Sequence, residues 1–345
     1  SASNGIETLT INASDGPLSV AGATNVWNLN TLTVTGSSNV TLTTITSNDN
    51  NITSVTASGV TGHFTATIDA MNGGTILLGA GNDTVDITGS AAAATTIQGG
   101  AGNDILTGAG GVDNMQGGAG TDTLTGAAGA DTLNGGDDND IIQGDADADT
   151  ITTGNGADTV VLTTVAGASA NADVISDFTA GAGGDQFEMD ISALETAGAV
   201  DATGPEAVNF VELQAGSAVT DVDTIVIQEL TLDAAAGLVA TVANTNVFVV
   251  IGTVASTGVL ETALEDGGDV ELVIAAGADV ITSAFPVVYS NGTHAFLAVC
   301  FLETAAVANT SITAGELTCV NIAQQSGNTA ITAGEFVAAN FDYVP

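Results

Sequence analysis

Aspartate and glycine recur at a fixed spacing in the middle of the chain, and their oxygen atoms are the best candidates for chemistry. Seven nonapeptides run without a gap from Gly99 to Val161 in the pattern G-G-x-G-x-D-x-U-x, where U is a large aliphatic residue. They read GGAGNDILT, GAGGVDNMQ, GGAGTDTLT, GAAGADTLN, GGDDNDIIQ, GDADADTIT and TGNGADTVV. A separate unit, LGAGNDTVD, begins earlier in the chain, at Leu78. Carboxylate and carbonyl oxygens suit hard cations, so the pattern predicts several bound Ca²⁺ ions and not zinc or copper.

The sixth place of each unit holds an aspartate, the expected charged ligand in preference to a merely solvated turn residue. These residues are Asp83, Asp104, Asp113, Asp122, Asp131, Asp140, Asp149 and Asp158. Glycines at the first, second and fourth places are expected to take positive φ and bring carbonyl oxygens close to the ion. They are Gly99, Gly100, Gly102, Gly108, Gly111, Gly117, Gly118, Gly120, Gly126, Gly129, Gly135, Gly144 and Gly156. Asp138 and Asp147 replace the fourth glycine and join the candidates, because aspartate tolerates left-handed backbone better than most residues; Thr153 replaces the first.

The eighth place of each nonapeptide predicts a column of inward-facing side chains that forms the core. The column contains Leu106, Met115, Leu124, Leu133, Ile142, Ile151 and Val160. If two nonapeptides make one coil, the aspartates of alternate nonapeptides stack in two rows, one beginning at Asp104 and the other at Asp113. Parallel strands set stacked loops about 4.8 Å apart, which leaves room for Ca²⁺ between them. Without metal the carboxylates repel one another, so we expect the roll to be largely disordered.

The charge balance of the chain points to the same external cation. The sequence has 40 acidic residues and no lysine or arginine, so only His63 and His294 offer a protein cation. Repulsion of that size destabilises a compact chain unless positive charge comes from outside. Phosphate backbones and anionic lipid surfaces are bound by Lys and Arg, so we exclude nucleic acids and direct membrane binding as partners. No run of about 20 apolar residues is present that would insert into a bilayer.

The repeats from Gly99 to Val161 resemble those of the RTX family. The resemblance implies a parallel β-roll and type I secretion with an uncleaved C-terminal signal, with folding delayed until the chain meets external calcium. It extends to Asp173–Phe178 and Asp185–Ser192, two segments expected to cover the end of the stack, and Asp177 joins the candidate ligands. The segments 330–336 and 340–344 are similar to the C-terminal ends of such exported chains.

The pattern predicts an all-β fold in three regions. Residues 1–77 have short alternating strands that fit a β-solenoid or a β-sandwich, and we favour the solenoid because it would stack onto the next region. Residues 78–192 form the calcium-binding β-roll with its cap. Residues 193–345 form a C-terminal, mainly β domain with an assembly or secretion role, and one helix is expected at 257–265. Cys300 and Cys319 either form a disulfide or remain buried thiols.

Catalytic motifs are missing from the sequence, and we expect a protein that is not an enzyme. The chain lacks H-E-x-x-H, the G-x-S-x-G elbow and a phosphate-binding loop. The leading hypothesis is a structural protein of the bacterial exterior, a surface-layer or filament subunit that forms a homo-oligomer or polymer with calcium. The alternatives are a secreted adhesin that binds cell-surface polysaccharide, and an extracellular hydrolase without its catalytic part.

Overall fold

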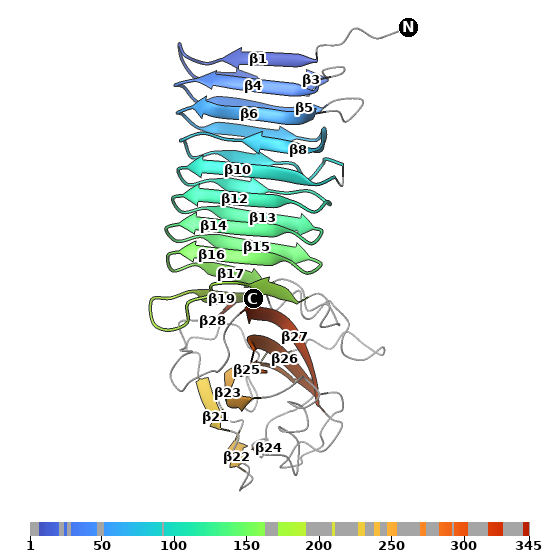
Figure 1. The fold of residues 1–345 in the computed structure, drawn as a ribbon, viewed down its shortest axis with the longest axis vertical. Helices are drawn as coiled ribbons and strands as arrows, with labels where there is room; N and C mark the ends of the chain where they lie inside the picture. The colour runs from blue at the N-terminus through green and yellow to red at the C-terminus, as the bar shows by residue number, and fades with distance from the viewer. Residues whose placement is uncertain are drawn as a thin grey trace. The chain divides into compact units, whose positions relative to one another are not determined.

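The fold contains only strands in the residues that the structure describes. The computed structural model describes residues 7–20, 24–25, 29–46, 52–91, 93–162, 172–190, 209–210, 227–231, 238–241, 247–253, 270–273, 283–291, 293–302, 317–326 and 341–344. The chain divides into two compact units, Ser1–Val161 and Leu162–Pro345 (Figure 1). The all-β prediction is confirmed. No described segment is a helix long and apolar enough to cross a membrane.

The first unit is a β-solenoid in which successive coils add one strand to each of two parallel sheets. The first sheet contains β1 (Thr8–Asn12), β4 (Thr31–Gly36), β6 (Ile52–Val60), β8 (Met71–Leu77), β10 (Thr95–Ala101), β12 (Asn114–Ala119), β14 (Thr132–Asp137) and β16 (Thr150–Asn155). The second contains β2 (Leu18–Val20), β5 (Val40–Thr46), β7 (Phe64–Ile68), β9 (Thr84–Asp86), β11 (Ile105–Thr107), β13 (Thr123–Ala128), β15 (Ile141–Ala146) and β17 (Thr159–Leu162), with β3 (Thr24–Asn25) beside β5.

The N-terminal coils are solenoid coils, as we favoured over a sandwich. Their strands pair in parallel with the next coil, Thr8 opposite Thr31 and Thr31 opposite Ser54. The coils become shorter along the chain. The paired residues Leu106 and Leu124 of the roll are closer in sequence than the paired residues Thr8 and Thr31 of the first coils. The separation of these two leucines equals two nonapeptides, which confirms that two nonapeptides make one turn of the roll.

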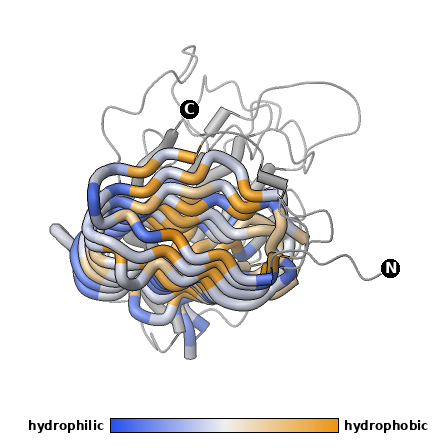
Figure 2. The backbone as a smooth tube through the Cα atoms, turned by 90° about the horizontal axis from the view of Figure 1, so that it is seen from above, coloured by the Kyte–Doolittle hydropathy of each residue, from blue (hydrophilic) through white to orange (hydrophobic). Residues whose placement is uncertain are grey.

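The core of the roll lies between the two sheets. The predicted column of aliphatic residues is fully buried, but the structure divides it into two facing columns, because alternate nonapeptides belong to opposite sheets. One column holds Met115, Leu133 and Ile151, and the other holds Leu106, Leu124, Ile142 and Val160. Figure 2 shows the hydrophobic positions of successive coils lying over one another.

The coils before the nonapeptides have a richer apolar core. Fully buried side chains there include Leu29, Leu32, Ile52, Phe64, Ile68, Met71, Ile76 and Ile87. Each nonapeptide of the roll instead buries one large aliphatic residue at its eighth place. Because burying such a side chain contributes about 1.5 to 3 kcal/mol, hydrophobic stabilisation per coil falls where the nonapeptides begin.

The second unit combines antiparallel and parallel strands. Its largest described group pairs β25 (Ser283–Ser290), β26 (His294–Leu302) and β27 (Leu317–Ser326) antiparallel. Parallel pairs join β25 to β20 (Asn209–Phe210) and β23 (Val247–Thr253), β23 to β21 (Ile227–Thr231), and β22 (Leu238–Thr241) to β24 (Val270–Val273). The helix expected at 257–265 lies outside the described residues, as do residues 330–336.

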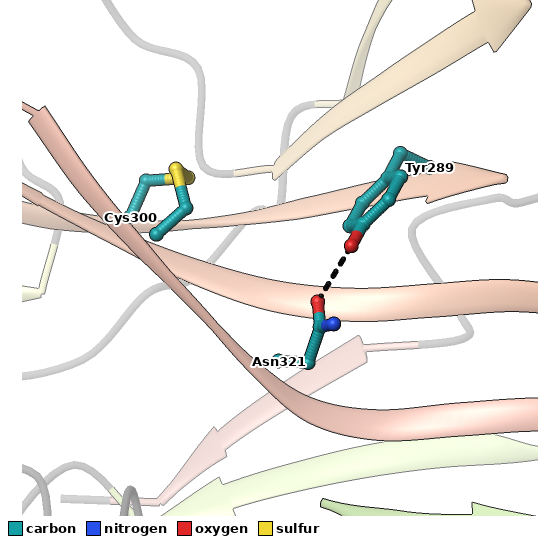
Figure 3. Close-up of a disulfide and its surroundings, with 4 residues drawn as sticks. Tyr289, Cys300 and Asn321 are labelled. Atoms are coloured by element: carbon teal, nitrogen blue, oxygen red, sulfur yellow. Dashed lines mark hydrogen bonds between the residues drawn. A yellow bond between two sulfur atoms is a disulfide. The ribbon is translucent and has the colours of Figure 1, made fainter. Parts of the chain in front are cut away.

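The two cysteines are bonded, which resolves the alternatives left open by the sequence. Cys300 and Cys319 lie directly opposite each other on β26 and β27 and form a disulfide (Figure 3). Nearby, the Tyr289 hydroxyl donates a hydrogen bond of 2.9 Å to Oδ1 of Asn321. The disulfide links the neighbouring strands β26 and β27, and the hydrogen bond links β25 to β27 across β26.

The two segments expected to form a cap are both strands. They are β18 (Asp173–Ile175) and β19 (Gln186–Asp190), and Phe178 and Phe187 stack with their ring centroids 4.2 Å apart. β18 pairs in parallel with β27, and β19 pairs in parallel with β28 (Phe341–Val344). Their position over the end of the roll stays a prediction, as do the three regional boundaries.

Candidate metal centres

The sixth-place aspartates form two ladders of hydrogen bonds that run along the roll. In one row, the backbone N–H groups of Asp104, Asp122 and Asp140 each donate to Oδ1 of the matching aspartate in the next coil, over 2.7 to 2.8 Å. In the other row, Asp113 and Asp131 donate in the same way over 2.7 Å. The two predicted rows are therefore confirmed, and every aspartate in them is buried.

The second carboxylate oxygen is the unusual atom of these residues. Oδ2 of Asp104, Asp122, Asp131 and Asp140 is buried and accepts no hydrogen bond. A buried carboxylate oxygen without a partner costs several kcal/mol unless a positive charge compensates it. Since the chain has neither lysine nor arginine, a bound cation is the candidate for that charge where the carboxylates are ionised.

A space bounded by oxygen atoms lies beside each of these Oδ2 atoms. A Cβ built on Gly126 would lie 2.5 Å from Oδ2 of Asp131 and 2.8 Å from the carbonyl oxygen of Gly144, in the next coil. These two oxygens leave no room for a side chain at Gly126, and carboxylate and carbonyl oxygens are the ligands that calcium prefers. Gly99, Gly117 and Gly135 have the same two kinds of neighbour, with Gly117, Gly135 and Thr153 supplying the carbonyl oxygen.

Glycine at the first place is therefore required for space and not for conformation. Of the nonapeptide positions, only the second and fourth take positive φ, as at Gly100 and Gly102, while the first-place glycines do not. The prediction that glycine at all three places takes positive φ is wrong for the first place.

Residues other than glycine also take the left-handed backbone in these turns. At the fourth place Asp138 (φ 75°) and Asp147 (φ 77°) do so, as we expected. No prediction from the sequence covered Ala127 and Asp145, which take positive φ at the second place. Their position in the repeat, where most units have glycine, is the signal that could have identified them.

The comparison with family models agrees with this geometry. Residues 92–124 and 125–160 match the model described as RTX calcium-binding nonapeptide repeat (4 copies). Residues 92–160 are RTX calcium-binding repeats. Searches of curated proteins and of solved structures give no match to the chain.

The oxygen atoms near the buried Oδ2 atoms belong mainly to the backbone. Within the described ranges, no group of three or more His, Cys, Asp and Glu side chains is arranged so that it could hold a metal ion by itself. One carboxylate comes from the coil's own aspartate, and carbonyl oxygens of stacked turns supply the rest of the oxygen-rich surroundings. Calcium bound to these repeats would supply the positive charge that the chain lacks, and the sixth-place aspartates with the carbonyl oxygens of the stacked turns would hold it, which stays a prediction.

Two sixth-place aspartates differ from the others. Oδ2 of Asp83 accepts the backbone N–H of Gly79 over 3.2 Å, and Oδ2 of Asp113 accepts that of Ala109 over 2.9 Å. Asp177 belongs to the second unit, where it lies half-buried in the bend after β18 and its carbonyl oxygen accepts the Thr179 hydroxyl over 3.5 Å. A ligand role for Asp177 stays a prediction.

Burial makes the RTX carboxyls unusually basic when no metal is bound. It raises the pKa of Asp104, Asp131 and Asp140 to about 7 and that of Asp122 and Asp149 to about 6. Neighbouring carboxylates raise these pKa values further; Asp138 acts on Asp122, and Asp147 acts on Asp131. The backbone hydrogen bonds to these carboxylates lower the pKa values and offset only part of the effect.

We expect the metal-free roll to be more stable at low pH, where protons neutralise the buried carboxylates in place of calcium. The unfolded carboxyls titrate near pH 3.9, so the metal-free folded roll binds protons that the unfolded chain releases. This contribution to stability is present at low pH and is lost as the pH rises through about 6 to 7. In excess chelator, circular dichroism should therefore show more β-structure at about pH 5.5 than at about pH 8. Calcium-loaded protein at both pH values is the control, and a chelated spectrum that does not change with pH would refute the prediction.

Proposed function

We propose that this chain is a structural protein of the bacterial exterior, a surface-layer or filament subunit that folds and assembles on binding calcium after type I secretion. The observation that carries the proposal is the set of buried Oδ2 atoms without a hydrogen bond in Asp104, Asp122, Asp131 and Asp140. The RTX roll of such a chain needs calcium from its surroundings to become compact. Sites on extracellular modules bind calcium in the range of about 10⁻⁴ to 10⁻³ M, which matches the outside of a cell.

The charge of the chain favours assembly that depends on the same ion. At a formal charge of −40, copies of the chain repel one another in the absence of divalent cations. Exposed carboxylates, such as Asp137 and Asp138 on one turn, stay available at the surface after the buried aspartates are occupied. Calcium bridging between such groups on neighbouring copies would offset the repulsion. The stacked coils also make a regular, rigid element of the kind that a lattice subunit requires.

Electron microscopy over a range of protein concentrations tests the proposal. We expect ordered sheets or filaments in millimolar calcium and separate subunits in chelator. Magnesium at equal ionic strength is the control, because Mg²⁺ demands near-octahedral geometry and keeps several of its waters. Monodisperse monomers at every concentration with calcium bound would contradict the assembly role while leaving calcium-dependent folding intact.

A second candidate is a secreted adhesin that binds cell-surface polysaccharide. One observation favours it: small hydroxyl side chains lie in register on the outer face of the first sheet. The row contains Thr8, Thr31, Ser54, Thr75 and Thr96. Binding of a calcium-loaded monomer to a glycan array would support this candidate over the surface-layer proposal.

A further inference from the structure

We infer that Asp83 and Asp113 bind no calcium, although both occupy the ligand place of the nonapeptide motif. Their coils form a metal-free junction, and the solenoid before it folds without calcium and serves as a template for the RTX roll. The inference rests on calcium binding by the RTX repeats and is independent of the proposed assembly role.

Backbone amides hold the carboxylates of Asp83 and Asp113 at both oxygens. Oδ1 of Asp113 accepts the N–H of Thr95 over 2.7 Å, and its Oδ2 accepts the N–H of Ala109 over 2.9 Å. Asp83 is held in the same way by the N–H groups of Phe64 and Gly79, over 2.7 and 3.2 Å. The N–H dipole directs its positive end at the oxygen that an ion would use, so a cation there would meet charge of its own sign.

The backbone conformation separates the same two units from the rest. The second-place residue takes positive φ in the units of Asp104, Asp122, Asp131 and Asp140, where Oδ2 lacks a hydrogen bond. Gly79 and Ala109, the second-place residues of the other two units, do not take positive φ. The fourth-place glycines of these two units, Gly81 and Gly111, also lack it. The backbone conformation and the hydrogen bonds to Oδ2 therefore both set the units of Asp83 and Asp113 apart from the other four.

The chain between Asp86 and Thr95 gives a physical reason for the difference. A Cβ built on Gly111 would lie 2.7 Å from the carbonyl carbon of Ala93, so this turn stacks on the extra residues of the preceding coil. The turn of Gly129, by contrast, stacks on Gly111, within another nonapeptide. In the unit of Asp83, the first place is the buried Leu78, whose own Cβ takes the space that glycine leaves elsewhere. In the unit of Asp113, Gly108 does have the same two kinds of oxygen neighbour as Gly126, with Asp113 Oδ2 at 2.8 Å and the Gly126 carbonyl oxygen at 2.5 Å from a built Cβ, so the Ala109 N–H and the backbone conformation are what separate this unit from the others.

The solenoid before this junction has the means to fold alone. Its interior is filled by large apolar side chains such as Phe64, Ile68 and Met71, all fully buried. The described residues of this part include no buried carboxylate oxygen that lacks a hydrogen bond. Its last strands, β8 and β9, pair with β10 and β11 and so offer the first coil of the roll a formed edge.

Two matched variants of the full chain test the inference. Asp113→Asn and Asp131→Asn change adjacent residues of one row, joined by the hydrogen bond from the Asp113 N–H to Asp131. We measure calcium bound per chain after equilibrium dialysis at about pH 8, where competition by protons is small. Asp113→Asn should bind as many ions as the unchanged chain, and Asp131→Asn should bind fewer. Equal loss of calcium in both variants would overturn the inference.

Hydrogen exchange on the unchanged chain tests the template role without any variant, so the test remains valid if a variant does not fold. In chelator at about pH 8, peptides from residues 29–91 should exchange at least roughly 100-fold more slowly than unfolded chain, while peptides from 117–161 lose their protection. Calcium should restore protection to 117–161 and leave 29–91 little changed. Loss of protection over both parts in chelator would overturn the template role. Neither measurement depends on lattice or filament formation.

Discussion

Chelation of calcium at about pH 8 is expected to abolish most of the β-structure of the RTX roll, and added calcium to restore it. Without the ion, the buried carboxylates of a row, such as Asp104 and Asp122, face each other across a strand spacing of about 4.8 Å. Their repulsion is roughly 1 to 4 kcal/mol for each neighbouring pair, and it is opposed mainly by the fully buried side chain at the eighth place of each nonapeptide. Circular dichroism and the thermal unfolding midpoint, each measured with calcium and with chelator, check the prediction.

Magnesium-saturated chelator is the appropriate control for that experiment, because it keeps the ionic strength constant while removing free calcium. The chelated chain should regain its spectrum when calcium is returned in excess. If the spectra and the unfolding midpoints were the same with and without chelator, calcium would not be a structural part of the roll. The buried Oδ2 atoms would then need another explanation.

Replacement of Gly126 by alanine is expected to remove a calcium site and destabilise the roll by more than about 3 kcal/mol. The new methyl group would lie 2.5 Å from Oδ2 of Asp131 and 2.8 Å from the carbonyl oxygen of Gly144, both inside van der Waals contact. It would also push apart two oxygens that are candidate ligands of the ion. Calcium bound per chain and the midpoint of urea unfolding in calcium are the measurements.

Gly59→Ala is the matched control for this substitution. Gly59 lies on β6, and a Cβ there would meet Thr35 Cγ2 at 3.7 Å, an ordinary contact. We expect this variant to bind as much calcium as the unchanged chain and to unfold at nearly the same urea concentration. If Gly126→Ala behaved like Gly59→Ala, the space beside Asp131 would not be an ion site.

The roll is predictable from the sequence because the nine-residue period positions both the buried aliphatic residues and the aspartates. A nonapeptide repeat with two units to a coil places Asp104 next to Asp122 and buries Leu106 and Leu124 without any knowledge of the turns. Residues 1–77 lack that regularity, since their coils vary in length and contain register shifts between Thr33 and Thr35 and between Leu42 and Ile45. Alternation of short strands predicted the fold class there but not the register.

The details of individual sites depend on peptide orientation, which residue types do not encode. The units GAGGVDNMQ and GAAGADTLN both have an aspartate at the sixth place and alanine at the second, yet Ala127 takes positive φ while Ala109 turns its N–H towards Asp113. The turn of this unit stacks through Gly111 on Ala93, a contact that becomes visible only when the coils are assembled. The role of the first-place glycines was hidden for the same reason, because the oxygens around them come from two different coils.

The return of the chain to the same sheet after every second nonapeptide has a consequence for how such proteins change in size. Inserting or deleting a pair of nonapeptides would alter the rod by one step of about 4.8 Å while each later strand keeps its sheet. An odd number would move each later strand to the opposite sheet. Duplication or loss of nonapeptides in pairs would therefore change the length of the roll in steps equal to the strand spacing, without rearranging the strands that follow.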